Sequence, residues 1–322
     1  MRLILVGDVM LGRWVNESLA ACPPEYPWGD TLSVLRSADA LIINLECVIS
    51  DRGRPWSGKT FTFRTDARNV AVLEAARVTA VSLANNHSLD YGDEALVECL
   101  EILSTHGIGA AGAGRSLDDA MKPARLSAEG GAITLLAFTD NEPGWEAGPA
   151  APGVFYVPLI RDDSRLSRWL SAIAHAAETD DLVVVSAHWG PNWGYHPLPE
   201  HVEAAHRFID AGADVVFGHS PHVVRAVERY REKPILYSGG DFIDDYAVDE
   251  HERNDQSFVF SLDYEGGRLR RVLMIPTVIE RLQARLAVQA ERPAILSKMK
   301  ALCRSVGTET RETPDGMEIL LS

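Results

Sequence analysis

The sequence lacks the marks of a disulfide scaffold, a cysteine-based metal knot and a membrane span. Its four cysteines form no Cys-x-x-Cys pair, so we expect reduced thiols at Cys22, Cys47, Cys99 and Cys303. No stretch of the 322 residues approaches the roughly 18 consecutive apolar residues of a transmembrane helix. The N-terminal apolar run is too short for a signal peptide, and an aspartate soon follows it. We therefore expect a cytoplasmic protein that binds no membrane.

Positive charge is also scarce. The chain has 31 lysines and arginines against 46 aspartates and glutamates, a formal net charge of −15. A nucleic-acid-binding protein needs a basic surface, so nucleic acid is not the expected partner. An anionic substrate remains possible, because a bound metal ion supplies positive charge locally. The composition is that of an ordinary globular protein, and we expect a small molecule or a peptide as its substrate.

Two common enzyme signatures are not supported either. Residues 53–60 match the Gly-x-x-x-x-Gly-Lys-Thr pattern, but they lie in a long excursion over residues 51–66 and do not join a predicted strand to a helix, so they do not predict a phosphate loop. There is no Gly-x-Ser-x-Gly elbow either, because Gly218-His219-Ser220-Pro221-His222 has a histidine where the last glycine would stand. This stretch follows an apolar run at residues 215–217, which we interpret as a buried strand. We expect Gly218 to turn the chain sharply there, so that the two imidazoles form half of a metal site.

Other predicted strands also end in side chains that bind metal ions. Counted with the stretch above, five strand ends carry such groups: Asp8, Glu46, Asn86-His87, His188 and His219/His222. In layered α/β folds the strand ends meet along one edge, where ligands bind. Three imidazoles, two carboxylates and an amide are enough for two divalent ions, which in hydrolytic sites lie roughly 3.5–4 Å apart.

Each of these residues also has a purely structural interpretation. Asp8 follows a glycine, as a turn former would, and Glu46 could pair with Arg64. Asn86 could cap the next helix, and a histidine such as His87 is more often hydrogen-bonded within the structure. Their joint occurrence at consecutive strand ends favours the metal site.

The alternation of strands and helices predicts α/β layers. Apolar periodicity indicates helices over residues 67–76, 93–106, 164–178 and 199–211. Residues 257–262 and 269–275 are expected to pair as an antiparallel hairpin, so a purely parallel sheet is not expected. We expect one domain over residues 1–275 and a C-terminal extension over residues 276–322, with helical runs and a small hairpin, packed on that domain.

Taken together, the motifs resemble the CapA-like family, which is named for poly-γ-glutamate capsule synthesis and is similar to the calcineurin-like metallophosphatases. The resemblance covers about residues 1–265 and rests on Gly7-Asp8-Val9-Met10, Asn44-Leu45-Glu46, Asn85-Asn86-His87-Ser88-Leu89-Asp90, His188-Trp189-Gly190 and Gly218-His219-Ser220-Pro221-His222. It implies a four-layer α/β/β/α sandwich of the metallophosphatase type, with two mixed sheets and the metals at one edge. It also implies one or two divalent ions, such as manganese, zinc or iron.

The resemblance assigns a role to each motif. Asp8 and His222 would bind the first ion, and Glu46 would take the bridging position between the ions. The second ion would be bound by Asn86, His188 and His219. His87 would be the general acid or base, held by Asp90, because an imidazole titrates near neutral pH.

Three departures from the phosphatase pattern weaken the case for plain phosphatase activity. Met10 stands where phosphatases usually have a histidine, and Glu46 replaces an aspartate. The last two histidines, His219 and His222, are one residue further apart than usual. The first ion thereby loses a ligand, so the working protein could use one ion instead of two.

Further residues are candidates for holding the substrate or the ligands. Lys59, Arg64 and Arg225 could bind a substrate carboxylate, although surface ion pairing is the more common role of such side chains. Trp189 could form part of an aromatic pocket, although packing explains it equally well. We expect Asp241 and Asn85 to orient metal ligands through hydrogen bonds.

Three functions are consistent with these features. The first is a metal-dependent hydrolase of an amide or ester in a peptide-like or glutamyl substrate, with His87 moving the proton. The alternative, which the resemblance to the CapA-like family implies, is a metal-dependent peptide epimerase that would invert an α-carbon in a ribosomal (lasso) peptide pathway. The third is a non-enzymatic scaffold, which would require the ligands to have persisted without use.

Overall fold

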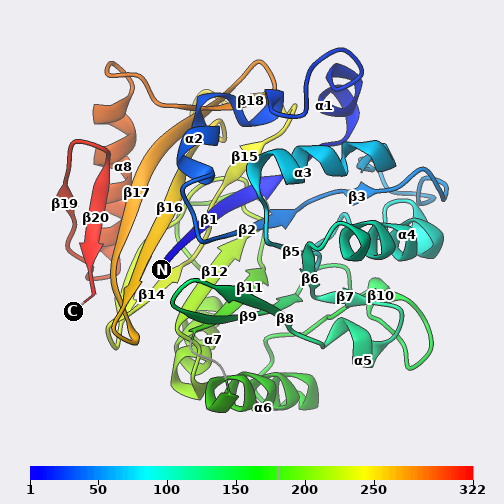
Figure 1. Ribbon diagram of the computed structural model, residues 1–322. Helices are drawn as coiled ribbons and strands as arrows, with labels where there is room; N and C mark the ends of the chain where they lie inside the picture. The colour runs from blue at the N-terminus through cyan, green and yellow to red at the C-terminus, as the bar shows by residue number, and fades with distance from the viewer. Residues whose placement is uncertain (180–181, 322) are drawn as a thin grey trace.

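The computed structural model describes residues 1–179 and 182–321 of the chain. Two mixed β-sheets lie face to face in the middle of the molecule, and helices cover the outer faces (Figure 1). This is the four-layer α/β/β/α sandwich that the resemblance implied. Within the two described ranges, no helix combines the length and the apolar character that a membrane span requires.

The first sheet has ten strands. They are β1 (Arg2–Val9), β2 (Ala40–Leu45), β5 (Ala80–Ser82), β6 (Gly109–Ala111), β15 (Asp241–Ile243), β16 (Gln256–Glu265), β17 (Arg268–Glu280), β18 (Gln283–Leu286), β19 (Arg311–Glu312) and β20 (Met317–Leu320). The main path runs β19-β20-β17-β16-β1-β2-β5-β6, with β15 paired to β1 and β18 paired to β17. The sheet is mixed, because β1 is parallel to β2 and antiparallel to β16.

The second sheet has six strands and a parallel centre. They are β8 (Ala124–Ala128), β9 (Gly131–Thr139), β11 (Leu182–His188), β12 (Val215–His219), β13 (Val227–Tyr230) and β14 (Lys233–Leu236). The order is β13-β14-β12-β11-β9-β8, with β9, β11, β12 and β14 parallel to one another. Two short pairs lie outside the main sheets: β3 (Val48–Ile49) with β4 (Arg64–Thr65), and β7 (Ala113–Gly114) with β10 (Gly153–Val154).

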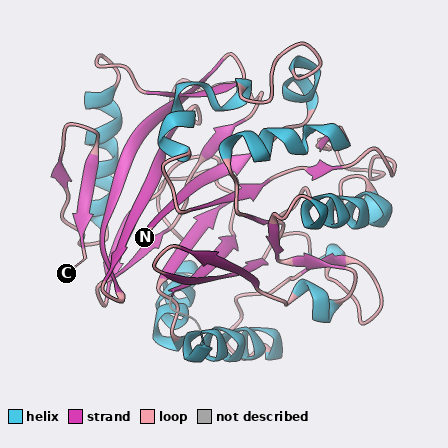
Figure 2. Ribbon diagram, viewed as in Figure 1, coloured by secondary structure: helices cyan, strands magenta, loops and turns pink. Residues whose placement is uncertain are grey.

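Helices form the two outer layers (Figure 2). The ten-stranded sheet is covered by α3 (Val70–Ala76) and α4 (Gly92–Thr105), and the six-stranded sheet by α6 (Ser164–Thr179) and α7 (Pro199–Ala211). Shorter helical elements lie in the connections: α1 (Arg13–Ser18), η1 (Tyr26–Thr31), α2 (Leu32–Leu35), η2 (Ala67–Asn69), α5 (Leu117–Ala120) and η3 (Pro143–Trp145).

Strand β1 contributes to two separate hydrophobic cores. Leu3 and Leu5 belong to the core that includes the six-stranded sheet and helices α6 and α7. Ile4 and Val6 belong to the core that includes α3 and α4. Successive side chains of a strand point to opposite faces, so an unbroken apolar run is what a strand covered on both sides requires.

The C-terminal segment joins the ten-stranded sheet. Strand β17 runs through residue 275, where the sequence suggested a domain boundary, and β18 and β20 pair with it. Strands β19 and β20 form the predicted small hairpin. Helix α8 (Arg292–Ser305) contacts β17 of one sheet and β13 of the other.

The register of the parallel strands gathers the predicted site residues at one edge. Asp8 of β1 lies beside Asn44 of β2 and Asp241 of β15. In the other sheet, His188 of β11 lies beside His219 of β12. Strand ends therefore converge as the sequence pattern predicted.

Gly7 allows two backbone segments to pack closely at this edge. A Cβ atom on Gly7 would lie 1.8 Å from the carbonyl oxygen of Gly240. The same oxygen accepts a hydrogen bond from the backbone N–H of Asp8, at 2.9 Å. A larger residue would therefore push apart the segments that carry Asp8 and Asp241.

The prediction of a sharp turn at Gly218 is wrong. Strand β12 continues through Gly218 to His219, and glycine is needed because a Cβ atom would lie 2.3 Å from the carbonyl oxygen of Tyr237. The chain turns later, at Ser220 and His222, whose φ angles are 106° and 59°. Left-handed backbone at non-glycine residues is costly, so the surrounding structure must hold these two residues in that conformation.

Candidate metal centre

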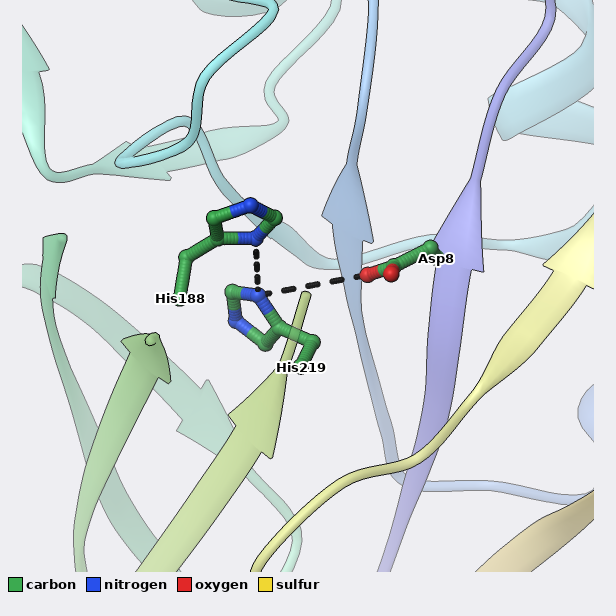
Figure 3. Close-up of side chains that lie close together, drawn as sticks. All are labelled: Asp8, His188 and His219. Atoms are coloured by element: carbon green, nitrogen blue, oxygen red, sulfur yellow. Dashed lines mark hydrogen bonds and ion pairs between the residues drawn. The ribbon is translucent and has the colours of Figure 1, made fainter. Parts of the chain in front are cut away.

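Two groups of metal-binding side chains share Asp8. Ligand atoms of Asp8, His188 and His219 lie within 4.8 Å of one another, and Figure 3 shows these side chains pointing together. A second group with the same spacing consists of Asp8, Glu46, His222 and Asp241. Asp8 is therefore the residue common to both groups, whereas Glu46, to which the resemblance gave the bridging position, belongs to one of them.

A buried chain of amides orients Asp8. Asn44 Nδ2 donates to Asp8 Oδ1 at 2.7 Å, and Asn85 Nδ2 donates to Asn44 Oδ1 at 3.1 Å. The backbone N–H of Ser220 approaches the other carboxylate oxygen of Asp8, at 3.4 Å. Asn85 also accepts a hydrogen bond from the backbone N–H of His87 at 3.0 Å, so one amide positions two parts of the site.

His188 and His219 face each other inside the protein. Their Nδ1 atoms are 2.8 Å apart, and His219 Nδ1 lies 3.9 Å from Asp8 Oδ1 (Figure 3). The other ring nitrogen of His219, Nε2, lies 2.6 Å from the hydroxyl of Ser186. Ser186 therefore holds the ring with Nδ1 toward Asp8, a role that no sequence motif indicated.

The unsatisfied polar atoms of the site fit a bound cation. Several buried atoms have no hydrogen-bond partner within residues 1–179 and 182–321, among them both carboxylate oxygens of Glu46, Asn86 Oδ1, His188 Nε2 and Asp241 Oδ2. Buried polar atoms in folded proteins are almost always paired. All of these atoms are ligands that divalent transition metals accept, so the residues present fit such an ion.

Burial sets the charge of the cluster. It raises the pKa of Asp8 to about 6, and burial together with repulsion among the carboxylates raises the pKa of Glu46 and of Asp241 well above the usual range. Burial lowers the pKa of His219 to about 3 and that of His188 well below its ordinary value. Neutral imidazoles are the form that binds metals, and a divalent cation offsets the repulsion between carboxylates.

His87 forms a pair with Asp90 at the edge of the cluster. Its Nδ1 lies 2.6 Å from Asp90 Oδ2, and its Nε2 lies 3.9 Å from Glu46 Oε1. The ring stacks on Phe63 with 4.0 Å between centroids, and burial lowers the pKa of His87 to about 4. Asp90 also accepts a hydrogen bond from Lys59 Nζ at 2.7 Å. A neutral His87 that donates through Nδ1 leaves Nε2 free to accept a proton.

A cavity of about 620 Å³ opens next to these residues. Four predicted site residues, Lys59, Asn86, His87 and His222, are among the residues that line it. The others are Arg13, Thr60, Phe61, Phe63, Asn192, Trp193, Tyr246, Ala247 and Asn254. The donor cluster is therefore reachable from the surface through a pocket large enough for a substrate of several groups.

Three of the four predicted substrate-binding side chains do not line this cavity. Trp189 is fully buried and stacks on His201, so it is a packing residue. Arg225 is also buried, and its Nε donates to the carbonyl oxygen of Gly194 at 2.8 Å. Arg64 lies over the ring of Tyr91 and donates to the carbonyl oxygen of Arg52 at 3.0 Å. Lys59 does line the cavity.

Other residues of the site were missed or underestimated by the sequence reasoning. Asp241 contacts His222 Nδ1 at 2.8 Å, the orienting contact expected of it, but it is also a member of a donor group. Its position directly after a glycine at the end of a predicted strand, like that of Asp8, was the available signal. Arg13, the first residue of α1, and Tyr246, in the loop after β15, also line the cavity, and nothing in their local sequence indicated this.

The fold and the cluster define a layered α/β protein with a buried carboxylate and imidazole centre at the sheet edge. The profile of the family described as "Bacterial capsule synthesis protein PGA_cap" matches residues 2–246. A "Probable polyglutamine synthesis accessory protein" of Mycobacterium tuberculosis (strain CDC 1551 / Oshkosh) is 34% identical, over 98% of this chain and 94% of that protein. The chain therefore belongs to the CapA-like bacterial capsule synthesis family.

Other relatives agree with this assignment. The PGA biosynthesis protein CapA of Bacillus subtilis (strain 168) is 30% identical, over 74% of this chain and 62% of that protein. Among solved structures, a hypothetical protein from Thermus thermophilus superimposes with a TM-score of 0.52 at 20% identity, over 87% of this chain and 99% of that chain. At that identity the likeness concerns the fold alone.

Proposed function

We propose that this protein is a metal-dependent hydrolase that cleaves an amide or ester bond in a glutamyl or peptide-like substrate. The observation that carries the proposal is the donor cluster around Asp8, which lies beside the His87–Asp90 pair and next to an open cavity. The names of the relatives support the substrate class, because they refer to polyglutamine synthesis and to PGA biosynthesis.

The donor cluster is the part of the site that would hold the metal. The residues that would bind one or two divalent ions are Asp8, Glu46, Asn86, His188, His219, His222 and Asp241. When bound, such an ion supplies Lewis acidity, which polarises a carbonyl group and makes water more acidic. Asn44 and Ser186 keep the ligands Asp8 and His219 in their orientations through hydrogen bonds.

His87 would move the proton. Its Nε2 faces the cluster from 3.9 Å away, while its Nδ1 is held by Asp90. In this arrangement Nε2 accepts a proton from the attacking water and returns it to the leaving amine or alcohol. The Asp90 carboxylate stabilises the imidazolium in between, and Lys59 keeps that carboxylate in place.

The cavity walls would recognise the substrate. The Nε of Arg13 pairs with Asp245 at 3.2 Å, but 34% of the Arg13 side-chain surface is accessible, so its other guanidinium nitrogens can pair with a substrate carboxylate. The hydroxyl of Tyr246 is buried without a hydrogen-bond partner in the described parts of the chain, so it can donate to a substrate oxygen. Phe61 and Trp193 offer exposed rings against which the methylene groups of a glutamyl chain can pack.

The decisive experiment is incubation in deuterated water. The protein, loaded with Mn²⁺ or Zn²⁺, is mixed with poly-γ-glutamate and with γ-glutamyl peptides, and the products are analysed by mass spectrometry and chiral chromatography. Hydrolysis predicts two shorter products with a new carboxyl group and an amine. A single product that is heavier by one deuterium and has inverted chirality would contradict hydrolysis and support the epimerase. If no substrate is turned over and the protein retains less than one ion per chain, both enzymatic functions fail and the non-enzymatic scaffold is the function that is left.

A further inference from the structure

Two loops contribute lining residues to the cavity. The first, residues 190–198, connects β11 to α7 and contributes Asn192 and Trp193. The second, residues 244–255, connects β15 to β16 and contributes Tyr246, Ala247 and Asn254. We call them the rim loops. The strands next to them belong to different sheets of the sandwich, β11 to the six-stranded sheet and β15 and β16 to the ten-stranded sheet.

A cluster of polar contacts joins the rim loops. The hydroxyl of Tyr195, from the first loop, donates a hydrogen bond to the carbonyl oxygen of Glu252, from the second. Lys298 Nζ donates to the same hydroxyl at 2.6 Å and to the same carbonyl oxygen at 3.1 Å. The ammonium group also lies 4.1 Å from the centre of the Tyr195 ring. Lys298 therefore touches both loops with one group.

Lys298 reaches the rim from the C-terminal part of the chain. It lies in helix α8, outside the residues 2–246 that match the family profile. Lysine side chains are normally exposed, but this one is half-buried and burial lowers its pKa. Burying an ammonium group costs free energy unless hydrogen-bond acceptors replace water. The hydroxyl of Tyr195 and the carbonyl oxygen of Glu252 are the acceptors that stabilise Lys298 here.

The first rim loop is also fixed on its inner side. Arg225 is buried, and it donates through Nε to the carbonyl oxygen of Gly194 at 2.8 Å and through Nη2 to that of Trp193 at 3.3 Å. The short segment from Trp193 to Tyr195 is thus held by a cation on each side. Arg225 attaches it to the six-stranded sheet, and Lys298 attaches it to the second loop.

We propose that Lys298 is a positioning residue that fastens the two rim loops to each other and thereby sets the width of the cavity. The C-terminal helix then contributes to substrate binding without touching the substrate. The claim about loop fastening is independent of the chemistry, whereas the claim about substrate binding rests on the proposed hydrolase function.

The test compares Lys298→Met with Lys300→Met. Lys300 lies on the same helix but is exposed and pairs with Glu312 at 3.7 Å, so it is a matched control. Hydrogen exchange measured by mass spectrometry is expected to rise severalfold in both rim loops of Lys298→Met and to stay at the wild-type level in Lys300→Met. Lys298→Arg, which keeps the charge and the N–H donors, should restore protection. Tyr195→Phe gives a second, milder disruption of the same cluster.

Kinetics test the consequence for the substrate. With the hydrolysed substrate, Lys298→Met should raise KM about tenfold and leave kcat and metal content near the wild-type values, because about 1.4 kcal/mol of binding is lost. If hydrogen exchange in the rim loops of Lys298→Met equals that of the wild type, Lys298 does not fasten the loops. If hydrogen exchange rises but KM is unchanged, the fastening does not contribute to substrate binding. If no substrate is hydrolysed, the proposed function fails, and the exchange experiment still decides whether Lys298 fastens the loops.

Discussion

His87 is the residue whose role the geometry separates most clearly from metal binding. Its Nδ1 is occupied by Asp90, and its Nε2 stands 3.9 Å from Glu46, beyond hydrogen-bond distance. It belongs to neither group of converging donor atoms, although it directly follows Asn86, whose amide oxygen is available as a ligand. Under the proposed function, adjacent residues in one short turn therefore serve two purposes, ion binding and proton transfer.

Replacing His87 by asparagine tests this separation. We expect His87→Asn to keep the wild-type metal content, because no ligand is removed, and to lose about 10²- to 10⁴-fold in kcat, which is the usual contribution of a positioned acid or base. Metal content is measured by elemental mass spectrometry and activity with the best hydrolysed substrate. His175→Asn, at an exposed position on α6, is the control. Loss of metal in His87→Asn would make His87 a ligand instead.

At the scale of elements, the site depends on how closely β1 approaches the segment before β15. The carbonyl oxygen of Gly240 contacts the backbone N–H of Asp8 at 2.9 Å, and Gly7 has no side chain to separate them. Asp8 and Asp241 are brought side by side by this contact. The same glycine that permits the packing of the strands therefore determines the distance between two carboxylates.

Gly7→Ala is expected to destabilise the protein and to weaken metal binding together. The added methyl group would lie 1.8 Å from the carbonyl oxygen of Gly240, so one backbone segment must move. Overpacking of this kind costs at least about 1–3 kcal/mol, which urea unfolding can measure. Gly144→Ala is the control, because its new methyl group meets nothing within 4 Å, and a change within about 0.5 kcal/mol is expected there. Equal stability of the two variants would contradict the close packing.

The whole molecule shows which features a single sequence can predict. The unbroken apolar runs predicted the central strands. Because parallel strands end at one edge of a sheet, the sequence also predicted that the polar residues at those ends, Asp8, Glu46, His188 and His219, lie near one another. The positions of Arg13 and Tyr246 at the cavity and of Lys298 at the rim loops were beyond such reasoning, because local patterns do not show which distant segments meet in space. The sequence could not predict that Trp189 and Arg225 are buried, since an aromatic or cationic residue next to a motif can point into the core or into the cavity.

The central claim is that the strand ends at this edge form a metal centre organised around Asp8. The most direct test is the metal content of the wild-type protein and of Asp8→Ala after loading with Mn²⁺, Zn²⁺ or Fe²⁺ and removal of free ion. Asp118→Ala, at an exposed position, is the control, and circular dichroism checks that all three proteins are folded. We predict at least one ion per chain in the wild type and the control, and almost none in folded Asp8→Ala, because Asp8 belongs to both donor groups. A wild-type protein that retains less than one ion, or an Asp8→Ala variant that retains its metal, would contradict the account.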